Sequence, residues 1–178
     1  MVIYYTITNY VSTADTPFRH DLARYVRNSG EGSYNPSEYT AMTMKCENPK
    51  STMILFSSGN MTIMGATSRF NSLNRFLDMK IAHDFSCFNV RITNIVCTCK
   101  FPPINLSDFY LYWSIYCFYE PRLFPGCTVK IPSTSMKANV FSTGKVVLSG
   151  GSSIEAIELS LNFVDDLFKK FHVFKKEK

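Results

Sequence analysis

The chain has 178 residues, of which 46% are hydrophobic and 19% are charged, a composition that predicts a packed fold and argues against intrinsic disorder. Its net charge of +5 permits a polyanionic partner but does not require one. No apolar run reaches the roughly 20 residues of a membrane-spanning helix. No secretion signal is predicted at the N-terminus, so the six cysteines are expected to be free thiols.

Hydrophobic periodicity and turn residues predict six elements in the first half of the chain. Asp21 is a favourable N-cap for the first helix, and Ser58-Gly59 is typical of a tight hairpin turn. The predicted elements are a strand at 4–14, a helix at 21–28, strands at 39–46, 51–57 and 61–64, and a helix at 68–81.

The second half follows the same plan after a short linker at 83–89. Ser107 or Asp108 is expected to cap its first helix. The last helix carries an apolar stripe, which is more typical of a core than of a partner site, and the tail at 169–178 is expected to fray in solvent. The predicted elements are a strand at 90–99, a helix at 107–117, strands at 128–131, 136–141 and 146–149, and a helix with Ile154, Ile157, Leu161, Val164, Phe168 and Phe171 on one side.

Three sequence blocks of the first half recur in the second half with one constant offset in residue number (94 − 9, 119 − 34 and 144 − 59 are all 85). The matched blocks are Ile7-Thr8-Asn9 with Ile92-Thr93-Asn94, Tyr34-Asn35-Pro36 with Tyr119-Glu120-Pro121, and Ser57-Ser58-Gly59 with Ser142-Thr143-Gly144. Chance would not hold one offset over separated blocks, so the sequence predicts a tandem duplication. Two repeats are too few for a solenoid, which favours a pseudo-twofold molecule with one shared sheet.

A sheet with helices on only one side leaves its other side uncovered. Side chains alternate along a strand, so Cys97 and Cys99 are expected to face the helices as core residues. The uncovered side is expected to carry Asn9, Val11 and Thr13, and their repeats Asn94, Val96 and Thr98. An uncovered apolar face is usually an interaction surface.

The repeated blocks, together with the string Tyr-Glu-Pro-Arg-Leu-Phe-Pro-Gly at 119–126, closely resemble the core domain of the TATA-binding protein family. The likeness extends from about Asn9 to Phe171. It implies an α+β saddle of two pseudo-twofold repeats, 1–85 and 86–178, with a concave antiparallel sheet of about ten strands and helices on the convex face. It further implies a transcription initiation factor that binds and bends A/T-rich, TATA-like DNA through the minor groove.

The resemblance also implies which residues contact DNA. A·T pairs offer mainly acceptors in the minor groove, and guanine adds an amino group that would clash with a close apolar surface. Aromatic residues are commonly core, but Tyr39 with Phe56 and Phe124 with Phe141 form two pairs related by the repeat offset, which favours wedges between base steps. The implied groove contacts are Asn9, Val11, Tyr39, Ile54, Phe56, Thr62, Asn94, Val96, Phe124, Asn139, Phe141 and Val147, and the implied phosphate contacts are Lys45, Lys50, Ser58, Lys130, Thr143 and Lys145.

The loop that contains Glu120, Arg122 and Leu123 resembles the surface on which the family docks transcription factor IIB. Arg122 stands where the family usually carries an acid, and charge reversal at a rim mainly alters partner choice. The implied partners are duplex DNA, a TFIIB-like factor, and a TFIIA-like factor or RNA polymerase machinery. The implied location is the nucleus, or the site of viral transcription for a virus-encoded copy.

Asn139 departs from the family pattern, where an apolar residue is usual, and Lys137 lies on the same side of the strand. A polar second half would relax the preference for A·T, since an Asn can accept a hydrogen bond from the guanine amino group. An interaction module with weak DNA binding, acting through its loops or convex face, therefore stays open as an alternative. The uncovered face would also suit a homodimer without DNA. No cofactor, metal, membrane or enzymatic activity is expected, because no ligand spacing or catalytic motif is present.

Overall fold

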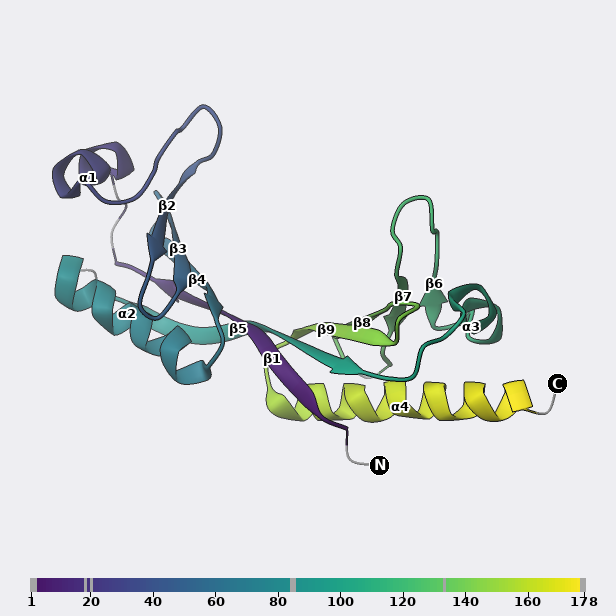
Figure 1. The fold of residues 1–178 in the computed structure, drawn as a ribbon. Helices are drawn as coiled ribbons and strands as arrows, with labels where there is room; N and C mark the ends of the chain where they lie inside the picture. The colour runs from purple at the N-terminus through teal and green to yellow at the C-terminus, as the bar shows by residue number, and fades with distance from the viewer. Residues whose placement is uncertain (1–2, 18, 20, 84–85, 133, 177–178) are drawn as a thin grey trace. The chain divides into compact units, whose positions relative to one another are not determined.

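The computed structural model describes residues 3–17, 19, 21–83, 86–132 and 134–176, and these contain four helices and nine strands (Figure 1). The first repeat contributes β1 (Tyr5–Asp15), α1 (Leu22–Ser29), β2 (Ala41–Cys46), β3 (Ser51–Phe56), β4 (Asn60–Ala66) and α2 (Arg69–His83). The second contributes β5 (Phe88–Lys100), α3 (Leu106–Tyr112), β6 (Cys117–Phe118), β7 (Cys127–Lys130), β8 (Lys137–Val140), β9 (Lys145–Gly151) and α4 (Ile154–Lys176).

The chain forms two compact units. The first unit is Thr8–Asn94, and the second unit is Ile95–Lys178 together with the N-terminal segment Met1–Ile7. In the first unit the strand order is β2-β3-β4-β1-β5, and in the second unit it is β1-β5-β9-β8-β7-β6. Both β1 and β5 therefore pass through the two units. The hairpin pairs are antiparallel, which confirms the predicted α+β class.

Strand registers repeat with the offset seen in the sequence. Across the first unit, Thr43 pairs with Ile54, Ile54 with Thr62, and Thr62 with Thr13. Across the second unit the corresponding row is Thr128, Asn139, Val147 and Thr98. Every member of the second row has its counterpart at the repeat offset (128 − 43, 139 − 54, 147 − 62 and 98 − 13 are all 85). The register irregularity after Tyr10 also recurs after Ile95, so the duplication extends to the details of strand pairing.

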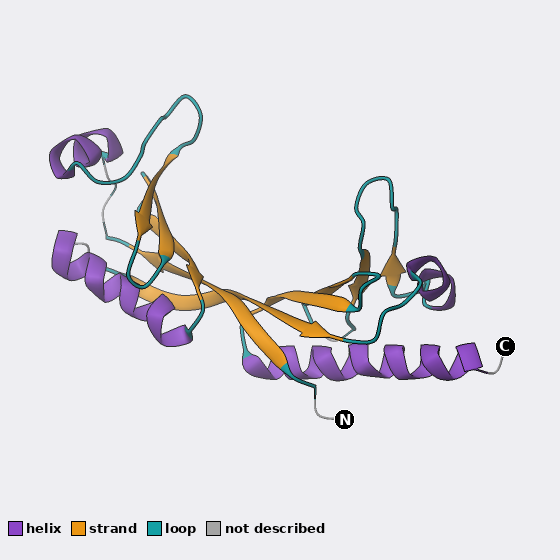
Figure 2. Cartoon of the chain, viewed as in Figure 1, coloured by secondary structure: helices purple, strands orange, loops and turns teal. Residues whose placement is uncertain are grey.

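Helices cover one side of the strands within each unit (Figure 2). In the first unit, α2 packs along β4, and alternate residues of β1, namely Tyr10, Ser12 and Ala14, are buried. The intervening Asn9, Val11 and Thr13 are half-buried. This alternation confirms the predicted split of the strand into a helix-facing and an uncovered side, because strand residues point to opposite faces in turn.

The second unit has an aromatic core beneath its strands. Phe101 stacks on Phe168 with ring centroids 4.4 Å apart, and Phe109 contacts Phe168 at 5.4 Å. Cys97 and Cys99 lie in the buried face of β5, as the sequence predicted. Burial raises the pKa of Cys97 to about 12 and that of Cys99 to about 11, because a thiolate loses its hydration there.

The helix predicted at 107–117 is shorter than expected and begins earlier. Asn105, rather than Ser107 or Asp108, is the N-cap, and its side chain accepts from the Asp108 N–H. The helix ends at Tyr112. Cys117 lies instead in β6, where it pairs with Val129 of β7. Pairing with β7 gives the backbone of this segment partners that an isolated helical turn would lack.

In the first repeat, a single β-bridge stands at the position that corresponds to β6. Ser33 forms a single bridge with Thr43. Their counterparts at the repeat offset (118 − 33 and 128 − 43 are both 85) are Phe118 and Thr128, which pair in β6 and β7. Nine described strands and one bridge therefore stand where about ten strands were expected.

The tail does not fray where the sequence suggested. Helix α4 continues to Lys176, and Phe171 is buried. Within this segment Lys175 forms an ion pair with Asp108 at 2.8 Å, and Phe174 packs on Tyr112 with centroids 4.5 Å apart. Contacts with α3 thus extend the helix, and only residues 177–178 of the predicted tail lie outside the described residues. The predicted linker is shorter than 83–89, since β5 begins at Phe88, and residues 84–85 also lie outside the description.

Candidate nucleic-acid interface

The uncovered face of the first unit carries five of the predicted groove contacts. Asn9 and Val11 lie on β1, Ile54 and Phe56 on β3, and Thr62 on β4, and all five side chains are half-buried. Thr43, which is not among the predicted contacts, completes the central row beside Ile54. The repeat offset and the alternation along β2 would have located it. The row is therefore a small, mainly aliphatic and hydroxyl-bearing surface.

Asn9 has a fixed orientation on this face. Its Oδ1 accepts a hydrogen bond from the Gly65 backbone N–H at 2.7 Å, and Gly65 has a φ of +92° that a residue with a side chain would rarely adopt. With the carbonyl oxygen engaged, the amide nitrogen keeps hydrogens for other acceptors. Such a donor matches the N3 and O2 acceptors of an A·T pair in the minor groove. Asn94, its repeat on β5, is also half-buried.

Both predicted aromatic pairs are in contact. Tyr39 meets Phe56 edge to face at 6.1 Å, and Phe124 meets Phe141 in the same way at 5.8 Å. In each pair one ring is exposed, since Tyr39 shows 46% of its surface and Phe124 shows 39%. A Cβ on Gly126 would lie 2.7 Å from the Phe124 ring, so this glycine makes room for the second pair. Each unit thus presents a supported, partly exposed aromatic edge.

The uncovered face of the second unit has a polar centre. Val96 on β5 and Val147 on β9 are half-buried, as predicted. Between Val147 and Thr128 lies Asn139, whose Oδ1 accepts a hydrogen bond from the Thr128 hydroxyl at 2.9 Å. The first unit has Ile54 at the corresponding position. The two faces therefore share a register but differ in the chemistry of their central residue.

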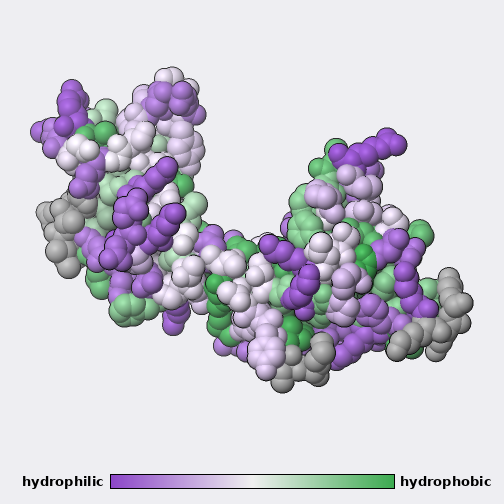
Figure 3. Space-filling model, viewed as in Figure 1, coloured by the Kyte–Doolittle hydropathy of each residue, from purple (hydrophilic) through white to green (hydrophobic). Residues whose placement is uncertain are grey.

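The two uncovered faces also differ in charge. The four corresponding positions of the first unit carry Asp15, Lys45, Thr52 and Asn60, while those of the second carry Lys100, Lys130, Lys137 and Lys145. All four lysines are exposed. Figure 3 shows hydrophilic side chains on the visible surface of both units. Phosphate contacts depend on such cations, so the second face has the stronger electrostatic attraction for a polyanion.

The remaining predicted phosphate contacts are also accessible. Lys50, Ser58 and Thr143 are exposed. Lys100, which is not among the predicted contacts, donates from Nζ to the Thr143 carbonyl. A shallow recess of about 540 Å³ beside it is lined by Tyr4, Thr6, Thr98, Cys99, Lys100, Thr143 and Lys145. Hydroxyl groups and ammonium groups are thus gathered at one end of the second face.

The loop predicted to bind a protein partner is a compact turn. The backbone N–H groups of Leu123 and Phe124 both donate to the Glu120 carbonyl at 3.0 Å. Leu123 shows 81% of its surface, and Arg122 is exposed. The turn therefore presents one apolar and one cationic side chain to solvent, next to the aromatic residue Phe124.

A family model described as transcription factor TFIID, or TATA-binding protein, matches residues 4–76 and 89–171. The chain belongs to the TATA-binding protein family. The starts of the two matched segments differ by the offset of the internal repeat (89 − 4 is 85).

Relatives within this family support the assignment. The chain is 34% identical over 151 residues to TATA box-binding protein-like 2 of Rattus norvegicus, covering 81% of this chain but only 44% of that relative. It is 32% identical over 163 residues to TATA-box-binding protein 2 of Entamoeba histolytica, covering 86% and 76%. The solved structure of Methanococcus jannaschii TBP has the same fold, with a TM-score of 0.78, 23% identity, and coverage of 93% of this chain and 98% of that one.

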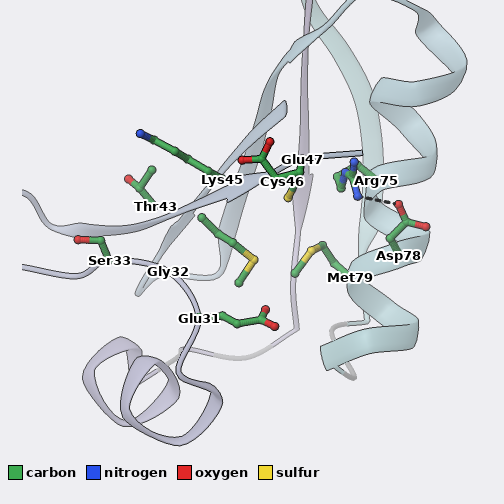
Figure 4. Close-up of a pocket in the computed structure, with 11 residues that line it drawn as sticks. Glu31, Gly32, Ser33, Thr43, Lys45, Cys46, Glu47, Arg75, Asp78 and Met79 are labelled. Atoms are coloured by element: carbon green, nitrogen blue, oxygen red, sulfur yellow. Dashed lines mark hydrogen bonds and ion pairs between the residues drawn. The ribbon is translucent and has the colours of Figure 1, made fainter. Parts of the chain in front are cut away.

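A groove outside the predicted interface lies in the first unit (Figure 4). It has a volume of about 580 Å³ and lies between the β2 edge and α2, where Arg75 and Asp78 form an ion pair at 3.1 Å. Arg75 also donates from Nε to Ser51 Oγ at 3.2 Å and from Nη2 to the Pro49 carbonyl. These bonds tie the turn between β2 and β3 to α2, which is a structural role. Of the predicted DNA contacts, only Lys45 lines this groove.

Other kinds of site receive no support among the described residues. No three His, Cys, Asp or Glu side chains come together there as possible metal ligands. His20, one of the three histidines, lies outside the described residues. None of the described helices combines the length and apolar character needed to cross a membrane.

Proposed function

We propose that this chain is a transcription initiation factor that binds TATA-like, A/T-rich promoter DNA through the minor groove and bends it. The observation that carries the proposal is the pairing of an uncovered face with an edge-to-face aromatic pair in each unit. An aliphatic face with short amide groups suits the acceptor-rich floor of an A·T minor groove. Partly exposed rings suit insertion between base steps, which unstacks the duplex and bends it. The action is DNA binding rather than catalysis, and the location is the nucleus or a site of viral transcription.

Binding and bending of a fluorescently end-labelled TATA duplex tests the proposal directly. A G·C-rich duplex of equal length at the same salt concentration is the comparison. We expect a dissociation constant of roughly 10⁻⁸ M or tighter on the TATA duplex, with a change in end-to-end energy transfer that accompanies binding. Weak binding without bending on both duplexes would contradict the proposal.

The aromatic pairs provide the sharpest variants. Replacing Phe124 and Phe141 with Ala is expected to weaken DNA binding at least about 30-fold, since buried aromatic anchors contribute about 2 kcal/mol or more, and to abolish part of the bend. Replacing Tyr39 and Phe56 is expected to do the same at the other end of the site. Leu159→Ala removes an apolar side chain that is 62% exposed on α4, and it serves as a control that leaves binding unchanged.

We also propose that a TFIIB-like factor docks on the turn at 120–123, with TFIIA-like factors or the polymerase machinery as further partners. Leu123 provides an exposed apolar anchor, and the cationic Arg122 selects an acidic group on the partner. Leu123→Ala is expected to weaken the complex by about tenfold, and Arg122→Glu is expected to weaken it further. An unchanged affinity for both variants, measured on DNA-bound protein, would place the docking surface elsewhere.

One observation favours the alternative of an interaction module. On α2, Phe70 and Leu77 lie seven positions apart, on one side of the helix, and they are 72% and 57% exposed. Exposed apolar side chains at this spacing suit a partner protein. This module is favoured if the unmodified protein binds the TATA duplex weakly and without bending, and if the Phe70→Ala, Leu77→Ala variant loses transcription activity. We also propose that the protein without DNA can form a homodimer through its uncovered faces. In that case, sedimentation is expected to show that added TATA duplex converts the dimer to a DNA-bound monomer.

A further inference from the structure

The central position of the uncovered face differs between the two units. Ile54 occupies it in the first unit, between Thr43 and Thr62. Asn139 occupies the matching position of the second unit, between Thr128 and Val147. Both side chains are half-buried on the uncovered side. Equivalent positions of the two units therefore carry an aliphatic group in the first unit and an amide in the second.

The amide of Asn139 is held in place. The Thr128 hydroxyl donates to its Oδ1 at 2.9 Å, which directs the amide group along the row. A carbonyl oxygen accepts two hydrogen bonds and an amide nitrogen donates two. One acceptor site and the amide hydrogens therefore stay available for a ligand on this face. Thr43, the counterpart of Thr128, has the aliphatic Ile54 as its neighbour in place of an amide.

The available donor and acceptor match a G·C base pair. In the minor groove this pair presents the guanine N3 and cytosine O2 acceptors, with the guanine N2 amino donor between them. The Asn139 oxygen can accept from the amino group while its nitrogen donates to N3. An A·T pair lacks the amino donor and cannot complete this pairing. An aliphatic residue such as Ile54 offers no partner to the amino group and clashes with it.

We propose that Asn139, oriented by Thr128, reads a guanine amino group, so that the half-site bound by the second unit accepts a G·C pair where the half-site of the first unit requires A·T. This inference rests on the proposed minor-groove binding and adds a specificity-determining residue to it. The preferred DNA is consequently asymmetric, with an A/T-only half and a half that contains one G·C position.

The charge of the second face supports this interpretation. Lys130 and Lys137 pair across β7 and β8, next to the Thr128–Asn139 pair, and the corresponding residues of the first face are Lys45 and Thr52. Contacts from ammonium groups to phosphates do not depend on base sequence. They compensate for the apolar contact that an amide at the centre gives up, so the second unit remains able to bind DNA.

The experiment measures affinities for a set of duplexes that carry one G·C substitution at each position of an A/T-rich parent site. For the unmodified protein we expect one position, within one half-site, at which G·C binds as well as or better than A·T. In Asn139→Ile, G·C at that position is expected to bind at least about tenfold more weakly relative to the parent, since a bidentate base contact discriminates by roughly 5- to 150-fold. The Thr128→Val variant, which removes the orienting hydroxyl, is expected to show an intermediate loss.

The matched control is the reciprocal variant Ile54→Asn, which is expected to gain tolerance of G·C in the other half-site. An unmodified protein that binds the parent but rejects G·C equally at all positions overturns the inference and leaves the proposed function intact. So does an Asn139→Ile variant with an unchanged profile. A protein that binds neither the parent nor any substituted duplex overturns the proposed function and this inference together. Thermal melting of each variant identifies losses of DNA affinity that arise from misfolding. If Asn139→Ile does not fold, Thr128→Val provides the second measurement.

Discussion

The two repeats share a backbone plan but differ in polar residues on both sides of the strands. At the helix-facing side, the first unit has the hydrogen-bonded pair Ser12 and Ser72 (2.7 Å between hydroxyls), where the second unit has Cys97 and Ile157 (97 − 12 and 157 − 72 are both 85). At the uncovered side, the first unit is aliphatic and near neutral, while the second unit has an amide centre and four lysines. The two units share the register, while individual side chains on both sides differ. The two halves of a DNA site are thus expected to meet different chemistries.

The largest expected effect tests the shared backbone plan. Gly144 and Gly59 occupy equivalent turns with φ of +81° and +99°, and a Cβ on Gly144 would overlap the Phe101 carbonyl oxygen. Gly144→Ala is expected to lower the free energy of unfolding by about 3 kcal/mol or more, because strain and overlap add. Gly59→Ala is expected to cost at least about 1–2 kcal/mol, because its positive φ strains a residue that has a side chain. Urea denaturation measures both. A neutral Gly144→Ala would show that the turn shifts to relieve the overlap with Phe101.

The buried serine pair tests the contrast between the cores. Ser72→Ala leaves the Ser12 hydroxyl in a fully buried site without its side-chain partner, which is expected to cost about 1–3 kcal/mol. The double variant Ser12→Cys, Ser72→Ile transfers the second unit's pair and is expected to be near neutral, because no unsatisfied group remains. Thermal melting compares the two. A double variant that is worse than the single would mean that the cores do not accept each other's residues.

The lysines test the contrast between the uncovered faces. Removing Lys130 and Lys137 together is expected to reduce the slope of log affinity against log salt by about 2, since each phosphate contact contributes about 0.9. Removing Lys45 from the first face is expected to reduce it by about 1. Lys170→Ala, on the exposed side of α4, is the matched control and should leave the slope unchanged. Equal slopes for all variants would contradict an electrostatic difference between the two faces.

The buried thiols give the smallest effect and occur in the second unit at positions where the first has Ser12 and Ala14. The folded pKa values of Cys97 and Cys99, about 12 and 11, lie above the ordinary thiol value near 9. A raised pKa means that the folded state holds the proton more tightly, so stability is complete below pH 9 and declines as pH rises from 9 towards 12. By pH 10 the expected loss is about 1 kcal/mol per thiol. Urea midpoints at pH 8 and pH 10 measure it, and Cys97→Ala, Cys99→Ala should flatten the difference.

Much of the fold could be predicted because each element occurs twice in the sequence, so the pattern in one repeat can be checked against the other. The glycine turns and the constant offset locate the hairpins, and alternation along β1 and β5 separates the covered from the uncovered side. The end of α3 could not be predicted, since the apolar pattern continues through Cys117 and only its pairing with Val129 decides that it is a strand. The extension of α4 likewise depends on contacts of Phe174 and Lys175 with α3. Tertiary contacts override local preference at both places.

The candidate interface could be predicted as a set of residues, but its internal bonds could not. The repeat offset placed Asn139 opposite Ile54 in the alignment of the repeats. The bond from Thr128 joins residues that are 11 positions apart, and it exists only in one register of β7 and β8, because a shift by one residue would turn the two side chains to opposite faces. The roles of these residues toward DNA remain predictions.

The division of β1 between the units has a consequence for the order in which the protein can fold. Residues 5–7 have their neighbours in the second unit, which begins at Ile95. The ribosome makes those neighbours only after the first repeat is complete. A nascent chain that has completed only its first repeat therefore has not yet made the residues on which residues 5–7 pack, and the second repeat lacks this part of β1 when it is produced alone. A cut between the repeats would therefore separate residues 5–7 from the unit in which they pack, although the two halves of the sequence are similar.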